Sequence, residues 1–274
     1  MIGVAGRSNY SKGRGAAKAA VWLGVYLLLF IVFAFVASRN MDGRSLVVAL
    51  CSIECAMLAV IVALFSVGLD PREIGNRRFV VRLLAVCVPA VAGSVIVIIV
   101  AALLQGGDAA DAPNSAQLLS QMIAAGLIAQ LVILSFCLLL GAVFALVRCS
   151  GSELLFAQLV AILVASMLLG TVFYADPIVE SQKSPEARST VISLALAANP
   201  ITAISGALPN FDLMRREMMY SRISVIGRFY PANYPEWWRT ALGYMVTASV
   251  ILLGAGVLRR YHRLKGAGGE GGGA

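Results

Sequence analysis

Residues 194–210 of the chain read LALAANPITAISGALPN, and this stretch decides how the fold is organised. It is apolar enough to enter a lipid bilayer, yet Asn199 and Pro200 interrupt it near its middle. Proline removes a backbone donor and disfavours helical geometry in the residue before it. We therefore expect one helix to end at Asn199 and a second helix to begin at Pro200.

Non-helical backbone can lie within the membrane only where it packs against protein or lines a water-filled cavity. Two short helices, at about 188–198 and 200–207, would meet this requirement by dipping into the outer leaflet and returning. We expect Asn199, Pro200 and Gly206 to form this re-entrant turn, or an outer gate. The alternative is a kinked seventh span, which would place the C-terminus outside. The basic tail RRYHRLK, residues 259–265, favours the re-entrant pair.

The composition predicts an all-α integral membrane protein. Of the 274 residues 59% are hydrophobic and 13% are charged, and the mean hydropathy is +0.85. Soluble domains carry about 25% charged residues. Because a spanning helix needs about 20 apolar residues, we expect six transmembrane helices, at about 20–37, 46–68, 80–104, 121–147, 154–174 and 240–258. No room remains for a soluble catalytic domain.

The distribution of lysine and arginine predicts that both termini are cytoplasmic. With this orientation, thirteen of the 22 basic residues lie on the inner side against four acidic ones, and the outer side has nine of each. Cytoplasmic loops are enriched in basic residues. The net charge of +8 therefore reflects membrane orientation, and no nucleic-acid partner is expected. The expected location is a bacterial-type cytoplasmic (inner) membrane, crossed several times.

Three regions follow from this topology. Residues 1–19 form a cytoplasmic basic N-terminus, residues 20–264 the membrane domain, and residues 265–274 a flexible glycine-rich tail. A signal peptide cleaved after Ala37 is the weaker alternative for the N-terminus, because its apolar run is longer than a signal core. The outer loop 175–239 holds a possible amphipathic surface helix near 213–222 and an interfacial aromatic cluster, Tyr230, Tyr234, Trp237 and Trp238.

Glu54 is the ionisable residue inside a predicted span. Intramembrane acids point to a function or to a specific partner. A proton-coupled role is one interpretation, although a single acid makes a poor relay. Pairing with a polar neighbour or with water from the outer face is the other.

The sequence contains no recognisable catalytic or metal-binding motif. It has no CxxC, HExxH, GxSxG or phosphate-binding loop, and its one histidine, His262, lies in the basic tail. We therefore expect no enzyme activity, no cofactor and no metal. No disulfide is expected, because the cysteines lie in spans or at a cytoplasmic end: Cys51, Cys55, Cys87, Cys137 and Cys149.

The inner loop after the second span, GLDPREIGNRRF at residues 68–79, has two interpretations. Its proline suits the first position of a short helix. The loop is either an ordinary positive-inside loop or a docking element for a partner subunit. The candidate docking residues are Asp70, Arg72, Glu73, Arg77 and Arg78.

The C-terminal third resembles a known family. ANPITAISGAL, YPEWWRTALGYM and LRRYHR, within residues 190–263, resemble exporter-class permeases of the ABC transporter superfamily, which carry an Asn-Pro element between spans five and six. YSKGRGAAKAA is a short counterpart of the family's amphipathic helix before span one, and the loop at 68–79 lacks the family's Gly-Thr pair. The resemblance implies a dimer, with a second copy or a paralogue, and a separate ATP-hydrolysing subunit docked at residues 70–78. Asn199 and Pro200 would form the outer gate.

Two other classes of function remain. A non-transporting membrane scaffold, part of a larger complex, is favoured by spans that hold few polar residues apart from Glu54. An intramembrane enzyme is least favoured, because no constellation of catalytic groups is present. Export is preferred to import, since no docking feature for a binding protein is recognisable.

Overall fold

The computed structural model describes residues 6–65, 71–108, 115–208 and 234–269, and all regular structure within these ranges is helical. The predicted surface helix near 213–222 lies outside the described residues. The helices are α1 (Gly6–Ser38), α2 (Gly43–Phe65), α3 (Pro71–Ile74), α4 (Asn76–Asp108), α5 (Ser115–Cys149), α6 (Leu154–Leu169), α7 (Thr171–Ser181), α8 (Pro185–Ala198), α9 (Pro200–Gly206) and α10 (Trp237–Gly269).

Five of these helices, α1, α2, α4, α5 and α10, are long and apolar enough to cross a membrane. Two further pairs reach that length only together, because α6 and α7 meet at a bend of 59° and α8 and α9 at a bend of 89°. The chain therefore has five candidate spans, or up to seven if each bent pair is one span. The multi-pass helical membrane fold predicted from composition is confirmed at this level.

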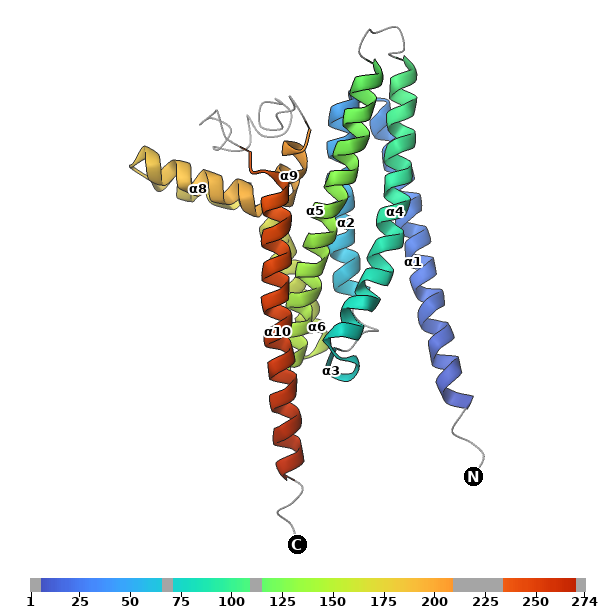
Figure 1. The fold of residues 1–274 in the computed structure, drawn as a ribbon, viewed down its shortest axis with the longest axis vertical. Helices are drawn as coiled ribbons and strands as arrows, with labels where there is room; N and C mark the ends of the chain where they lie inside the picture. The colour runs from blue at the N-terminus through green and yellow to red at the C-terminus, as the bar shows by residue number, and fades with distance from the viewer. Residues whose placement is uncertain (1–5, 66–70, 109–114, 209–233, 270–274) are drawn as a thin grey trace.

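Helix α5 is the centre of the bundle. α10, α4, α2 and α6 pack along it, and α1 reaches the bundle through α4 and α2 (Figure 1). Small residues let the helices approach closely, as expected for membrane bundles. A Cβ at Gly141 of α5 would lie 2.3 Å from Leu83 Cδ2 of α4. The polar residues Gln130 and Ser135 of α5 are buried within the bundle.

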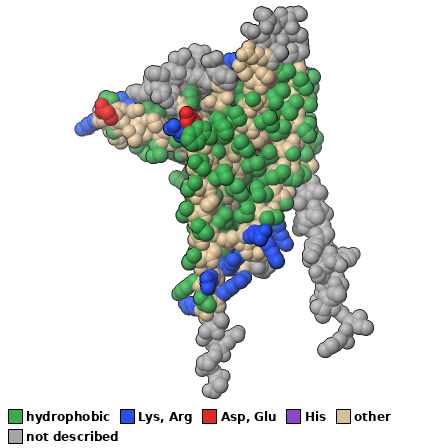
Figure 2. Space-filling model, in the orientation of Figure 1, with side chains coloured by type: hydrophobic (Ala, Val, Ile, Leu, Met, Phe, Trp, Pro, Cys, Tyr) green, Lys and Arg blue, Asp and Glu red, His purple; other side chains and the backbone are tan. Residues whose placement is uncertain are grey.

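The outward faces of the helices are apolar. On α10 the side chains of Leu253 and Val257 are 72% and 70% exposed, and on α8 Leu194 is 70% exposed. Figure 2 shows hydrophobic side chains covering the middle of the bundle. A water-soluble protein rarely exposes so continuous an apolar surface, so lipid is the solvent of these faces.

The chain enters and leaves at one end of the bundle. α1 begins and α10 ends at this end, which also holds α3 and the turn between α5 and α6 (Figure 1). Figure 2 shows arginine and lysine side chains gathered there, and we call it the basic end. The opposite end, here the far end, carries the α1–α2 turn, α8 and α9.

The helices differ from the predicted spans mainly at their ends. α1 begins at Gly6, well before the predicted start, and α10 continues to Gly269. The predicted fifth span, 154–174, is interrupted at Gly170, whose N–H still bonds Ser166 O while the chain turns into α7. Beyond α7, α8 lies across the long axis of the bundle rather than along it (Figure 1).

Candidate functional site

The predicted break between two helices at Asn199 and Pro200 is confirmed, and the side chain of Asn199 stabilises it by hydrogen bonds. Its Oδ1 accepts hydrogen bonds from the backbone N–H groups of Ile201 at 2.8 Å and Thr202 at 3.4 Å, which caps the start of α9. Its Nδ2 donates to Leu169 O at 2.8 Å, at the end of α6. One side chain therefore ends α8, begins α9 and fixes both to the α6–α7 bend. We call this the elbow.

The elbow also satisfies the carbonyl groups that a helix end leaves open. The last four carbonyls of an α-helix have no partner within the helix, and at membrane depth each open group costs several kcal/mol. Hydroxyl groups from α7, α9 and α10 donate to them. The pairs are Thr171 Oγ1 to Ala195 O (3.1 Å), Thr202 Oγ1 to Leu196 O, Thr240 Oγ1 to Ala197 O (3.1 Å) and Tyr244 OH to Ala198 O (2.7 Å).

The residues predicted for the re-entrant turn have different environments. Asn199 and Pro200 are buried, with Asn199 fully so, and Thr202 and Ser205 beside them are also fully buried. Gly206 is exposed at the end of α9. A Cβ there would lie 3.2 Å from Pro235 O, so the glycine lets the chain before α10 approach closely. The buried residues of the elbow are therefore packed and hydrogen-bonded inside the protein.

Glu54 lies in a second group of polar side chains, inside the bundle. Gln130 Nε2 of α5 donates to Glu54 Oε2 of α2 at 2.8 Å, and the hydroxyl groups of Ser94 (α4) and Tyr26 (α1) lie beside the same carboxyl group. Tyr26 OH and Ser94 Oγ are 2.5 Å apart. Four helices therefore meet at this cluster, which we call the polar cluster.

The polar cluster contains no cationic partner. Within the described part of the chain, no lysine, arginine or histidine forms an ion pair with Glu54. One oxygen of each partner, Glu54 Oε1 and Gln130 Oε1, is buried with no hydrogen-bond partner among the described residues. The interpretation that Glu54 pairs with a polar neighbour is therefore confirmed. The side chains of the polar cluster thus connect four helices by hydrogen bonds.

At the basic end, the predicted docking residues separate into two groups. Arg72, on α3, points into the protein, where its Nε donates to Arg148 O and its Nη2 donates to Ser152 O at 2.9 Å. Arg77 and Arg78, at the start of α4, are exposed. Asp70 lies outside the described residues, and so does the side chain of Glu73. Arg72 thus holds α3 against the α5–α6 turn, and its side chain is half-buried.

The segment from α3 to the start of α4 is also joined to α10. Arg259 Nη1 donates to Pro71 O at 3.3 Å, Arg263 Nη2 donates to Arg72 O at 3.4 Å, and Asn76 Nδ2 donates to Leu252 O. These contacts connect α3 and the start of α4 to the second half of α10.

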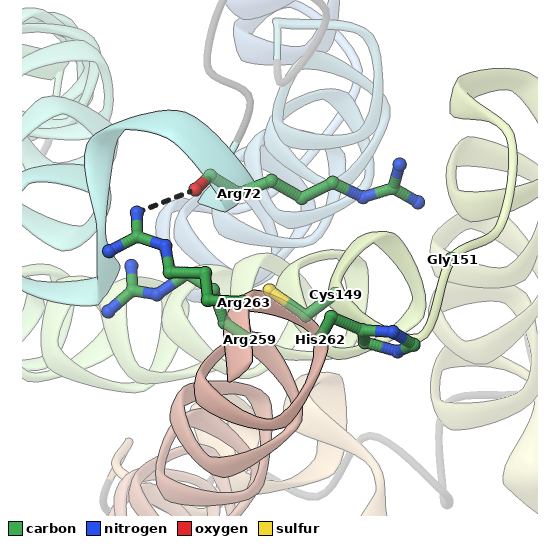
Figure 3. Close-up of a pocket in the computed structure, with 6 residues that line it drawn as sticks. All are labelled: Arg72, Cys149, Gly151, Arg259, His262 and Arg263. Carbon is green, nitrogen blue, oxygen red and sulfur yellow. Dashed lines mark hydrogen bonds between the residues drawn. The ribbon is translucent and has the colours of Figure 1, made fainter. Parts of the chain in front are cut away.

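A cavity of about 330 Å³ opens between these elements (Figure 3). This cavity was not predicted from the sequence, in which the basic tail indicated the orientation of the chain and contributed to the family resemblance. The spacing of Arg259, His262 and Arg263, at i, i+3 and i+4, was the available signal, because such residues share one helix face. The residues that line the cavity are Arg72, Cys149, Gly151, Arg259, His262 and Arg263.

The described residues offer no metal site. No group of three or more histidine, cysteine, aspartate or glutamate residues could hold a metal ion in the ranges that the structure describes. The five cysteines are buried among the helices, and none forms a disulfide within the described part of the chain. The candidate functional features are therefore the elbow, the polar cluster and the cavity at the basic end.

Compared with known protein families, curated proteins and solved structures, the chain matches none of them. The function must therefore be argued from the residues and their arrangement.

Proposed function

We propose that this chain is the membrane permease subunit of an ATP-driven exporter, which works as a dimer, with a second copy or a paralogue, and with a separate ATP-hydrolysing subunit. One observation carries this proposal. α10 contacts the elbow at the far end, through Tyr244 OH and Ala198 O at 2.7 Å, and the loop after α2 at the basic end, through Arg259 Nη1 and Pro71 O at 3.3 Å.

This connection is what an ATP-driven permease requires. A partner that binds at the basic end must change the far end, because the energy source and the outer opening lie on opposite sides of the membrane. Rigid helices with discrete contacts at each end are a physical means of such coupling. Here the exposed Arg77 and Arg78 adjoin α3, and α3 is fixed to both α5 and α10.

In this proposal the chain has six spans, and both termini lie in the cytoplasm of a bacterial-type cell. α6 and α7 form one bent span, and α8 and α9 enter the membrane from the far side and return. The common position of the start of α1 and the end of α10 supports an even number of crossings (Figure 1). The basic side chains gathered at that end support a cytoplasmic location for it.

A non-transporting scaffold subunit is the second candidate. The polar cluster favours it, because Glu54 and Gln130 bind each other across α2 and α5 rather than facing a pathway. In this case the elbow is a packing device, and the exposed apolar faces contact other subunits as well as lipid.

The deciding experiment is an affinity purification of the full-length chain in mild detergent, with mass spectrometry of the proteins recovered. The exporter proposal expects an ATP-binding-cassette subunit in near-equal amount. The charge-reversal variant R77E/R78E should lower its recovery. R260E is the control, because Arg260 is exposed at the same end and its side chain forms no hydrogen bond to α3 or α4 among the described residues. A fixed complex without an ATPase would support the scaffold and reject the exporter.

A further inference from the structure

The cavity at the basic end has an unusual concentration of positive charge. Three guanidinium groups and one imidazole line it, and no acidic residue is among the lining residues that the structure describes. Figure 3 shows Arg259 and Arg263 of α10 extending to one side, next to the backbone of Arg72 in α3, while the Arg72 side chain extends the other way, toward the turn that holds Gly151. Gly151 in that turn has φ +106°, a conformation that suits glycine. The wall of the cavity is thus formed by three separate elements.

We propose that this cavity binds a phosphate group, supplied by the headgroup of an anionic phospholipid. Arginine presents a planar fork of donors that matches phosphate oxygens, and it is the preferred residue for such contacts. The proposal does not depend on the presence of an ATPase partner.

The arginines of α10 retain donors for a ligand. Arg259 and Arg263 each make one long hydrogen bond to a backbone carbonyl, at 3.3 and 3.4 Å, and neither pairs with a carboxylate among the described residues. A guanidinium group has five N–H donors. Both side chains can therefore bind phosphate oxygens without giving up a strong ion pair.

Arg72 has a different task. Its guanidinium group is held by Arg148 O and Ser152 O, so it contributes positive charge and a fixed wall to the cavity. Its own carbonyl oxygen accepts from Arg263, as the dashed line in Figure 3 marks. A phosphate between Arg259 and Arg263 would therefore lie against α3 as well as α10.

The depth of the cavity favours a lipid as the source of the phosphate. The apolar part of α10 ends at Leu258, one residue before Arg259, and α5 ends at Cys149, which also lines the cavity. We place the boundary of the hydrocarbon region at these levels, because the apolar stretches end there. Basic pockets between transmembrane helices on the cytoplasmic side suit anionic headgroups.

The test is a titration of the full-length protein in uncharged detergent micelles that contain phosphatidylcholine. Phosphatidylglycerol is added, and the shift in thermal midpoint gives its apparent affinity. A second titration uses inorganic phosphate. Three double variants are compared with the wild type: R259A/R263A, R259K/R263K and R78A/R260A. The last is the matched control, because it removes two exposed charges at the same end and neither residue lines the cavity.

We expect R259A/R263A to weaken phosphatidylglycerol binding by about 30-fold, at about 1 kcal/mol for each arginine. R259K/R263K should lie between this variant and the wild type, because lysine keeps the charge but loses the fork. The affinity of the control R78A/R260A for phosphatidylglycerol should fall a few-fold at most, since exposed charges interact weakly through water. Circular dichroism should show equal helix content in all variants.

Two results would overturn the site. One is an equal loss in R259A/R263A and R78A/R260A, which would mean diffuse surface electrostatics. The other is wild-type protein that binds phosphatidylglycerol no better than phosphatidylcholine and does not bind inorganic phosphate. If inorganic phosphate binds with the same ranking of variants and phosphatidylglycerol does not, the phosphate site stands and the lipid source is rejected.

Discussion

Gln130 Nε2 donates a hydrogen bond to Glu54 Oε2 at 2.8 Å, and this contact joins α2 to α5 inside the bundle. Glu54 is fully buried and Gln130 is 4% exposed. No solvent competes for either group, so each depends on the other.

Removal of either partner should destabilise the protein. Hydrogen bonds between membrane helices contribute about 0.6–1.7 kcal/mol. We therefore expect a double-mutant cycle of E54A and Q130A, measured by denaturation in detergent, to give a coupling energy in this range. Gln121→Ala is the control, since Gln121 lies on the same helix, is only half-buried and makes no side-chain hydrogen bond among the described residues. Strictly additive single effects would contradict the pairing.

The elbow gives a second prediction, at Tyr244. Its hydroxyl group donates to Ala198 O, the last carbonyl of α8. Y244F removes only this hydroxyl and leaves a partly buried carbonyl without its partner, so it should cost about 1–3 kcal/mol. The measurement is the free energy of unfolding in detergent.

Tyr174→Phe is the matched control for that measurement. Tyr174 is 58% exposed on α7, and its hydroxyl group forms no hydrogen bond among the described residues. Y174F should leave stability unchanged. A similar loss in both variants would mean that the carbonyl of Ala198 does not depend on Tyr244.

The sequence predicted the break at the elbow because its cause is local. Asn199 and Pro200 are adjacent, and proline acts on its own residue and on the one before it. The donors that satisfy α8 could not be predicted, because they come from distant parts of the chain. Thr171, Thr240 and Tyr244 lie 24, 43 and 46 residues from the carbonyls they bind. Only the packing of the helices brings them together.

The same distinction applies to the polar cluster and the basic end. A lone acid in a span allowed two interpretations of Glu54, a proton-coupled role or pairing with a polar neighbour or water. The partner itself, Gln130, could not be named, because the pairing depends on how α5 is rotated. Arg72 belonged to a basic loop in the sequence, and nothing local indicated that it would turn inward toward Ser152 O. Local rules therefore predicted where helices break and which residues need partners, and tertiary packing decided the partners.

Gly75 gives a third prediction. It joins α3 to α4 with φ +77°, in the left-handed region, and a Cβ there would lie 2.8 Å from Arg259 Nη1. We expect G75A to cost about 1–2 kcal/mol from backbone strain and to displace Arg259 from Pro71 O. Thermal stability in detergent measures the first effect.

The control for Gly75 is Gly243→Ala on α10. A Cβ at Gly243 would meet no atom within 4 Å, and alanine is a better helix former than glycine. G243A should therefore be neutral or stabilising. If G75A is equally neutral, the positive φ at Gly75 is not required by the fold.

The number of spans can be tested by cysteine labelling in intact cells with a membrane-impermeant maleimide. The native cysteines are all buried, so the background should be low. K183C lies between α7 and α8 and should be labelled from outside. R77C and K265C, at the basic end, should react only after the membrane is permeabilised. If α8 and α9 together formed a seventh span, K265C would be labelled from outside. The other two positions would keep their expected labelling, because only α10 follows that span. Labelling of R77C from outside would reject the proposed orientation as a whole.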